Sequence, residues 1–155
     1  MRIASFGRPV FVLQWVLAVL LPIWVFLGRG FVGAEMGWMG VLGFLYGPIV
    51  ILLLLLPPVL ALFDPIARRG RTVRVIYGIA MIVQWVALLL VSITIPDAGD
   101  GGPLRPALAV WTGMSPEAVV PFFTAGMLIA SAAWFATLAV AVAGILRGRR
   151  EAREE

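Results

Sequence analysis

Four long apolar runs separated by short polar segments make up most of the chain. The runs cover residues 10–27, 41–63, 75–95 and 119–146. Each reaches the roughly 17–25 residues that an α-helix needs to cross the hydrocarbon core of a bilayer. A helix satisfies its own backbone polar groups, which lipid cannot do. The pattern therefore predicts an all-α integral membrane protein, in which residues 1–155 form a single membrane domain of four transmembrane helices arranged as two helical hairpins.

The first run has a second interpretation, because its flanks resemble those of a secretory signal peptide. Arg2 and Arg8 precede the run, and Val32-Gly33-Ala34 could serve as a cleavage site after it. The apolar region of a signal peptide has only about 7–15 residues, which is shorter than this run. We therefore expect a transmembrane helix that is not cleaved.

Prolines interrupt the second run, and two of them are adjacent. Pro57 and Pro58 each lack the N–H of a helical hydrogen bond, and each ring clashes with the preceding turn. We expect a kink at Pro57-Pro58, with neighbouring helices satisfying the carbonyls that the prolines free. The alternative is that this kink acts as a gating hinge.

Small residues recur along the fourth run at helical intervals. Lipid gives helices no hydrophobic reason to associate, so close backbone contact through small residues takes that role. One stripe consists of Gly126, Ala130, Ala133, Thr137 and Gly144, and a second consists of Ala132, Ala136, Ala139 and Ala143. Two stripes predict that this helix packs against two neighbours. The alternative is that one stripe forms a dimer interface.

Uncharged polar side chains lie within the runs, whereas no Asp, Glu or Arg lies deep in any of them. Ion-coupled transporters usually carry an ionisable group at that depth. Gln84 shares a helical face with Tyr77 and Met81, so we expect it to make one interhelical hydrogen bond worth about 0.6–2 kcal/mol. Gln14-Trp15-Val16 and Gln84-Trp85-Val86 are similar, either through duplication or by coincidence. The intramembrane polar residues are Gln14, Gln84, Ser92, Ser131 and Thr137.

The composition supports a membrane protein and removes several kinds of chemistry. Hydrophobic residues make up 62% of the 155 residues, against about 45–50% in soluble domains. All 12 basic residues are Arg, a bias that suggests a high-GC bacterial genome. The absence of His and Cys excludes disulfides, thiol nucleophiles and imidazole bases or ligands. We expect no cofactor and no metal site.

The uneven distribution of arginine predicts the orientation of the chain. Arg29 and Arg105 lie in the segments 28–40 and 96–118, whereas all other arginines lie in the segment 64–74 or near the two termini. Because cytoplasmic loops are enriched in basic residues, we expect both termini and loop 64–74 on the cytoplasmic side of the inner (plasma) membrane and the other two loops outside. Arginines next to a membrane also bind anionic headgroups. The residues assigned to this anchoring are Arg68, Arg69, Arg71, Arg74, Arg147, Arg149 and Arg150.

Asp64 is one candidate for chemistry between the runs. It lies four residues before Arg68, and the two could form a catalytic pair. It also lies directly before Pro65, where the backbone disfavours the helical region. The end of a helix is therefore a sufficient explanation for this position.

The segment 96–118 contains the remaining acidic candidates. Asp97 and Asp100 lie in a Gly-rich stretch with too few ligands for a calcium loop, so we expect a flexible turn there. Residues 106–111 are apolar and predict a turn of helix at the membrane surface. Ser115-Pro116-Glu117 has the features of a helix start: an N-cap residue, proline at the first position and an acid in the first turn.

These observations favour a small polytopic membrane protein without a catalytic site, acting as an accessory or structural subunit. The expected partners are a bilayer with anionic headgroups and either another membrane protein or a second copy of the chain. The alternative is a small channel or transporter that acts as a homo-oligomer, and a third reading is an enzyme that acts on lipid. Nucleic-acid binding is not expected, because the arginines lie beside the membrane rather than on a folded basic domain.

Overall fold

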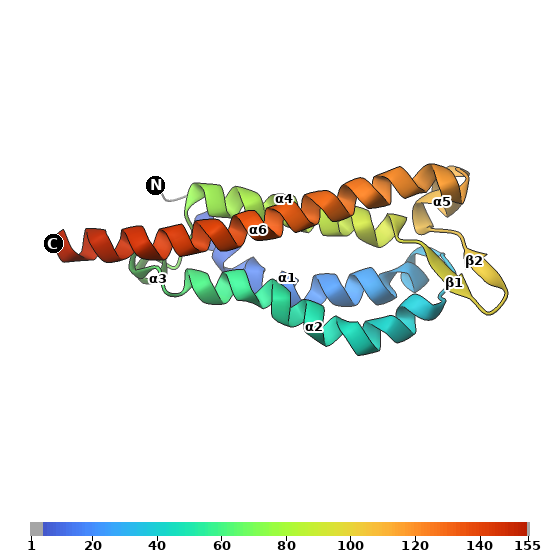
Figure 1. The fold of residues 1–155 in the computed structure, drawn as a ribbon, viewed down its shortest axis with the longest axis horizontal. Helices are drawn as coiled ribbons and strands as arrows, with labels where there is room; N and C mark the ends of the chain where they lie inside the picture. The colour runs from blue at the N-terminus through green and yellow to red at the C-terminus, as the bar shows by residue number, and fades with distance from the viewer. Residues whose placement is uncertain (1–4, 155) are drawn as a thin grey trace.

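The computed structural model describes residues 5–154 and is mostly helical, with one short pair of strands (Figure 1). The first half consists of α1 (Gly7–Leu27), the 3-10 helix η1 (Gly28–Val32) and α2 (Trp38–Ala61). A short helix, α3 (Pro65–Gly70), leads into α4 (Val75–Thr94). The strands β1 (Asp97–Gly99) and β2 (Gly102–Leu104) and the short helix α5 (Ala107–Thr112) precede the last helix, α6 (Pro116–Glu154).

Four helical stretches are long and apolar enough to cross a membrane: Gly7–Val32, Trp38–Ala61, Val75–Thr94 and Pro116–Gly148. This confirms the all-α architecture with four membrane-length helices that the apolar runs predict. The start of α6 also follows the sequence, because the Ser115 hydroxyl accepts a hydrogen bond from the backbone N–H of Ala118 at 3.3 Å.

The four long helices form a ring, in which α1 and α6 each pack against both α2 and α4. α6 is the longest helix, and its C-terminal turns project beyond the other helices (Figure 1). The start of α1 and α3 lie at the end from which α6 projects, and the strand pair lies at the opposite end (Figure 1). We call these the arginine end (residues 64–74) and the hairpin end (residues 97–104).

Apolar side chains form two separate clusters within the ring. The cluster nearer the arginine end contains Val10, Ala61, Val73, Tyr77, Met81 and Ala141. The cluster nearer the hairpin end contains Val25, Val91 and Ile95. The glutamines of α1 and α4, Gln14 and Gln84, are both buried as well. Burial of an amide costs free energy unless the amide is hydrogen-bonded, so both glutamines need partners inside the bundle.

Only one of the two small-residue stripes of α6 packs within the chain. A Cβ at Gly126 would lie 3.1 Å from Cγ2 of Val91 on α4, so this position favours glycine. The buried stripe comprises Gly126, Ala130, Ala133, Thr137 and Gly144. α6 does pack against two neighbours, α2 and α4, as expected. The second stripe takes no part in this packing, because Ala132, Ala136 and Ala139 are exposed and Ala143 is half-buried. We call these four residues the outer alanine stripe.

α2 remains helical through Pro48, Pro57 and Pro58, and its ribbon is bent (Figure 1). Pro57 has no N–H to donate to the carbonyl of Leu53, four residues earlier. The indole Nε1 of Trp134 on α6 donates to this carbonyl instead, at 2.9 Å. A neighbouring helix therefore satisfies a carbonyl that a proline frees, as we expect for a membrane helix.

The hairpin end contains two strands where we expect a flexible turn. β1 and β2 are antiparallel, with Asp97 opposite Leu104 and Gly99 opposite Gly102. Gly102 has a φ of 121°, a conformation that is strained for residues with a Cβ. The connecting dipeptide Asp100-Gly101 is a known hairpin signal, so the sequence does carry information for this turn.

Candidate functional site

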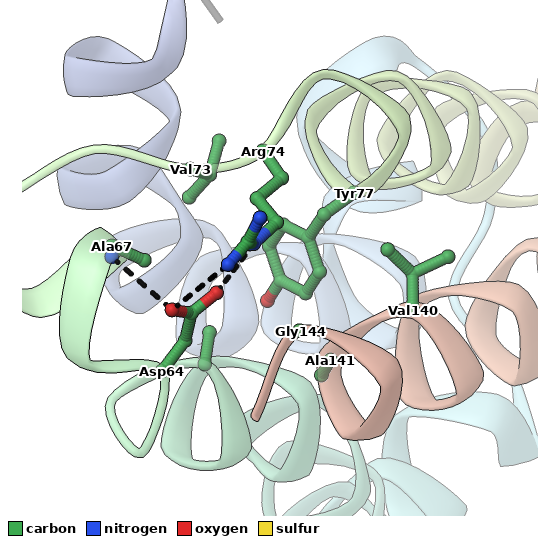
Figure 2. Close-up of a pocket in the computed structure, with 9 residues that line it drawn as sticks. Asp64, Ala67, Val73, Arg74, Tyr77, Val140, Ala141 and Gly144 are labelled. Carbon is green, nitrogen blue, oxygen red and sulfur yellow. Dashed lines mark hydrogen bonds and ion pairs between the residues drawn. The ribbon is translucent and has the colours of Figure 1, made fainter. Parts of the chain in front are cut away.

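A buried ion pair between Asp64 and Arg74 closes the arginine end of the bundle (Figure 2). Nε of Arg74 lies 2.6 Å from Oδ2 of Asp64, and Nη2 lies 3.3 Å from Oδ1. Only 5% of the Arg74 side chain and 4% of the Asp64 side chain are exposed. Two contacts from one guanidinium to one carboxylate give this pair a fixed orientation as well as a charge interaction.

Glycines of α6 allow the helix to lie directly against this pair. A Cβ at Gly144 would lie 2.9 Å from Oδ2 of Asp64, and one at Gly148 would lie 2.7 Å from Oδ1. The cavity between these elements has about 10 Å³ of space, and Tyr77, Val140 and Ala141 also line it (Figure 2). This is enough for about one water molecule. The arrangement therefore excludes a substrate from the carboxylate.

The geometry does not support a catalytic pair of Asp64 and Arg68. Arg68 is exposed on α3, and its backbone N–H bonds to the Asp64 carbonyl at 3.0 Å as part of a helix start. The side chain of Asp64 instead contacts Arg74 and lies 3.5 Å from the backbone N of Ala67. The ion pair of Asp64 with Arg74 thus links the residues that follow α2 to the residue that precedes α4.

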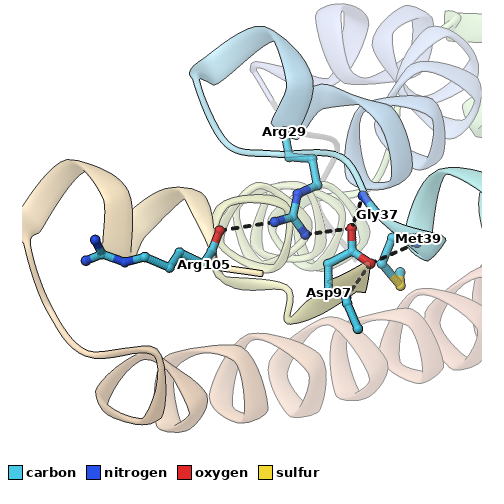
Figure 3. A network of polar contacts seen from close by, with 6 residues as sticks. Arg29, Gly37, Met39, Asp97 and Arg105 are labelled. Carbon is cyan, nitrogen blue, oxygen red and sulfur yellow. Dashed lines mark hydrogen bonds and ion pairs between the residues drawn. The ribbon is translucent and has the colours of Figure 1, made fainter. Parts of the chain in front are cut away.

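A second buried ion pair, between Arg29 and Asp97, lies at the hairpin end (Figure 3). Nη1 of Arg29 lies 3.0 Å from Oδ2 of Asp97, and each side chain is only 1% exposed. Asp97 also accepts hydrogen bonds from the backbone N–H groups of Gly37 at 2.8 Å and Met39 at 3.0 Å. A carboxylate at the N-terminus of α2 suits both the free amides and the helix dipole.

Arg29 connects this pair to the segment before α5. Its Nη2 donates to the carbonyl of Arg105 at 3.1 Å (Figure 3). The guanidinium of Arg105 in turn donates to the carbonyls of Ala109 and Met114, at 3.0 Å and 3.2 Å. The hairpin end is thus held by a chain of arginine contacts that joins η1 to β1, to the residue after β2 and to α5.

These contacts correct the expectation of a flexible turn at the hairpin end. Within the segment 28–40, Arg29 is only 2% exposed and packs inward. Asp97 binds Arg29 and backbone amides. Across residues 5–154, the described side chains contain no group of three or more Asp, Glu, His or Cys residues suited to a metal ion. The ionic partner of Asp97 lies far away in sequence, which is why local motif reasoning misses it.

The buried glutamines differ from our expectations. Gln14 makes the interhelical hydrogen bond, because its Oε1 accepts from the Tyr77 hydroxyl at 2.9 Å while its Nε2 donates to the Phe11 carbonyl at 3.1 Å. Gln84 is 3% exposed, yet its Oε1 has no hydrogen-bond partner among the described residues. The expected interhelical bond from Gln84 is therefore wrong, and its amide carbonyl is a buried acceptor without a donor.

The other intramembrane polar residues mostly bond to their own helices. The Ser92 hydroxyl donates to the Leu89 carbonyl and the Thr137 hydroxyl to the Trp134 carbonyl, both at 2.7 Å. Ser131 is exposed and lines a groove between helices. Hydroxyls that bond back to the preceding turn are satisfied locally and leave little capacity for a ligand.

Most arginines of the predicted anchor are exposed, and one is not. Arg74 is buried against Asp64, so it is a structural residue of the arginine end rather than a headgroup contact. The side chain of Arg149 lies outside the described part of the chain. The exposed members are Arg68, Arg69, Arg71, Arg147 and Arg150.

A groove lies between α2, α4 and α6. It has about 340 Å³ of space, and Gln84 lies at its inner wall. Leu53, Met127 and Phe135 also line it and remain partly exposed, so the groove opens to the outside of the bundle. In a membrane, such an opening faces lipid.

Comparison of the chain with protein-family models, with curated proteins and with solved structures finds no match.

Proposed function

We propose that this chain is a non-catalytic membrane subunit, which packs against another membrane protein or a second copy of itself through the outer alanine stripe. The observation that carries the proposal is the exposure of Ala132, Ala136 and Ala139 along α6. Small residues permit the close helix approach on which association in lipid depends. Large exposed side chains, including Leu128 and Phe135, lie along the same helix and could pack around such a contact.

Both buried carboxylates are paired with arginines, which supports a structural role for these charges. Asp64 is paired with Arg74 and Asp97 with Arg29, and each pair is nearly removed from solvent. A general acid or base must reach a substrate, and the cavity beside Asp64 holds about 10 Å³. These charges therefore hold the ends of the bundle together.

The proposal places the protein in the inner membrane with both termini in the cytoplasm. The chain has no Cys, so single-Cys variants report position without background. In spheroplasts of a bacterial host, a membrane-impermeant maleimide should label Asp100→Cys at once and Arg69→Cys only after permeabilisation. Both positions are exposed. The reverse pattern would overturn the orientation that the arginine distribution predicts.

Association should depend on the outer alanine stripe. We expect the protein purified in mild detergent from its native membrane to elute as a stoichiometric complex. Ala136→Leu introduces a bulky side chain at the centre of the stripe, and overpacking of about 1–3 kcal/mol should lower the association constant by about 5- to 150-fold. The measurement is the molecular mass by light scattering, together with mass spectrometry of the copurifying chains.

A matched control adds bulk to a different exposed face. Val86 on α4 is 61% exposed, so Val86→Phe should leave the complex intact. A monodisperse single chain in the wild type, or equal effects of the two variants, would contradict the proposal.

The small internal cavities of a single bundle give little support to the alternative that the protein is a channel. The cavity beside Gln14 and Gln84 holds only about 10 Å³, as does the cavity beside Asp64 and Arg74. Each has room for about one water molecule. Solute flux in liposomes that changes with Gln84→Leu would nevertheless favour a channel over a structural subunit.

A further inference from the structure

The groove between α2, α4 and α6 combines an apolar wall with a buried polar group that the fold leaves unsatisfied. Gln84 is 3% exposed, and its Oε1 has no partner among residues 5–154. An unpaired amide oxygen inside a bundle costs about 1–3 kcal/mol, which a ligand with a donor would recover. Gln84 also borders the small cavity beside Gln14, which has room for about one water molecule. Because Oε1 is fully buried, a ligand in the groove reaches it after rotation about Cγ–Cδ, which exchanges the positions of Oε1 and Nε2.

The prolines of α2 also free backbone carbonyls of residues that line the groove. Pro58 lacks the N–H that would bond to the carbonyl of Leu54, four residues earlier. Leu54 lines the groove. The equivalent carbonyl of Leu53 accepts from the Trp134 indole, which also lines the groove and donates its only N–H to that bond.

We propose that this groove binds a membrane-soluble long-chain alcohol, with its hydroxyl on Gln84 and its chain along α2 and α6. A hydroxyl donates to Oε1 and can accept from the amide NH₂, so it suits either orientation of the side chain. The wall carries no charged side chain, which favours an uncharged ligand. The space of about 340 Å³ lies within the range of about 300–1,000 Å³ that small ligands occupy.

Two other occupants explain the unpaired amide less well. A saturated lipid tail fills apolar space but cannot donate a hydrogen bond, so Gln84 would stay unsatisfied. A helix of a partner protein could donate from a side chain, but the outer alanine stripe provides a closer approach on a different face of α6. The inference concerns the groove alone and does not depend on the association proposed above.

The test uses photolabelling of the full-length protein in phosphatidylcholine vesicles. The probe is a twelve-carbon alcohol with a diazirine beside the hydroxyl, and the matched control is its methyl ether, which lacks the donor. In a free bilayer the polar end of either probe stays near the headgroups. We expect the alcohol to label Met127 and Ser131 about three- to tenfold more than the ether does, the ratio that one hydrogen bond provides. Excess dodecanol should compete for this labelling.

Two variants distinguish the contribution of the Gln84 hydrogen bond from that of the groove volume. Gln84→Leu replaces an unsatisfied amide with an apolar side chain of similar size, so the fold should persist, and labelling by the alcohol should fall to the level of the ether. Met127→Trp fills the groove and keeps Gln84, and it should reduce labelling by both probes. Labelling of exposed Ile79 on α4 provides the reference in every sample.

Three results would overturn the inference. The first is equal labelling of groove residues by the alcohol and the ether. The second is a preference for the alcohol that survives Gln84→Leu. The third is protection of the groove residues from both probes in the complex purified from the native membrane, which would show that a partner chain occupies the groove. Ala136→Leu should not alter labelling, so failure of the association proposal and failure of this one are distinguishable.

Discussion

Replacing Asp64 with alanine should destabilise the protein by about 3–5 kcal/mol, because the substitution leaves Arg74 buried without its carboxylate. The two side chains are nearly inaccessible, and their closest atoms lie 2.6 Å apart. Gly144 and Gly148 hold α6 against the carboxylate, so water cannot easily replace it. The measurement is the free energy of unfolding in mixed micelles, obtained by titration with a denaturing detergent.

A control and a double variant separate the pair from the individual charges. Arg68→Ala removes an exposed arginine of the same segment and should change the free energy by less than about 0.5 kcal/mol. The double variant Asp64→Leu with Arg74→Leu removes both charges and should recover much of the loss, because an apolar pair needs no compensation. If the single and double variants lose the same amount, the ion pair is not the cause.

Asp97→Ala should have a comparable effect at the other end of the bundle, again about 3–5 kcal/mol. The substitution leaves Arg29 unpaired and removes the acceptor of the Gly37 and Met39 amides at the start of α2. Hydrogen exchange of these amides should accelerate before the middle of α2 is affected. Mass spectrometry of exchange in the peptides that cover residues 33–45 measures this.

Asp97→Asn and Asp100→Ala sharpen this test. The amide of asparagine keeps an acceptor for the α2 backbone but not the charge, so its loss should be smaller than that of alanine. Asp100 is exposed in the tip of the hairpin, and its substitution should leave both stability and exchange unchanged. Rapid exchange at Met39 in the wild type would contradict the role assigned to Asp97.

The long helices could be predicted from the sequence because lipid imposes a simple rule. Each run is apolar over the length of a membrane, and backbone groups inside lipid must be paired within a helix. The start of α6 at Pro116 was predictable for a similar local reason, since Ser115 is an N-cap residue. The spacing of small residues predicted close packing of α6, but it did not distinguish the buried stripe from the exposed one.

The ion pairs could not be predicted because their partners are brought together by the fold. Arg29 and Asp97 belong to different halves of the chain, and only the packing of η1 beside β1 makes them neighbours. A lone arginine at the end of an apolar run was the available signal, since such a charge needs a partner. The unpaired state of Gln84 was equally hidden, because Gln14 and Tyr77 form the bond that the sequence suggested for Gln84.

The two charged contacts also limit how the bundle can move. Alternating-access transporters rock one half against the other and open first one side and then the other. Here such a motion would pull η1 from β1 at one end and strain the link from α2 to α4 at the other, and losing either buried pair costs several kcal/mol. At mid-depth α2 faces α6 across the groove and is joined to it by the hydrogen bond from Trp134 to the Leu53 carbonyl, without an ion pair, so less free energy opposes separation of the two helices there. We therefore expect the main fluctuation of this protein to be a separation of α2 from α6 in the plane of the membrane, while the two ends of the bundle remain closed.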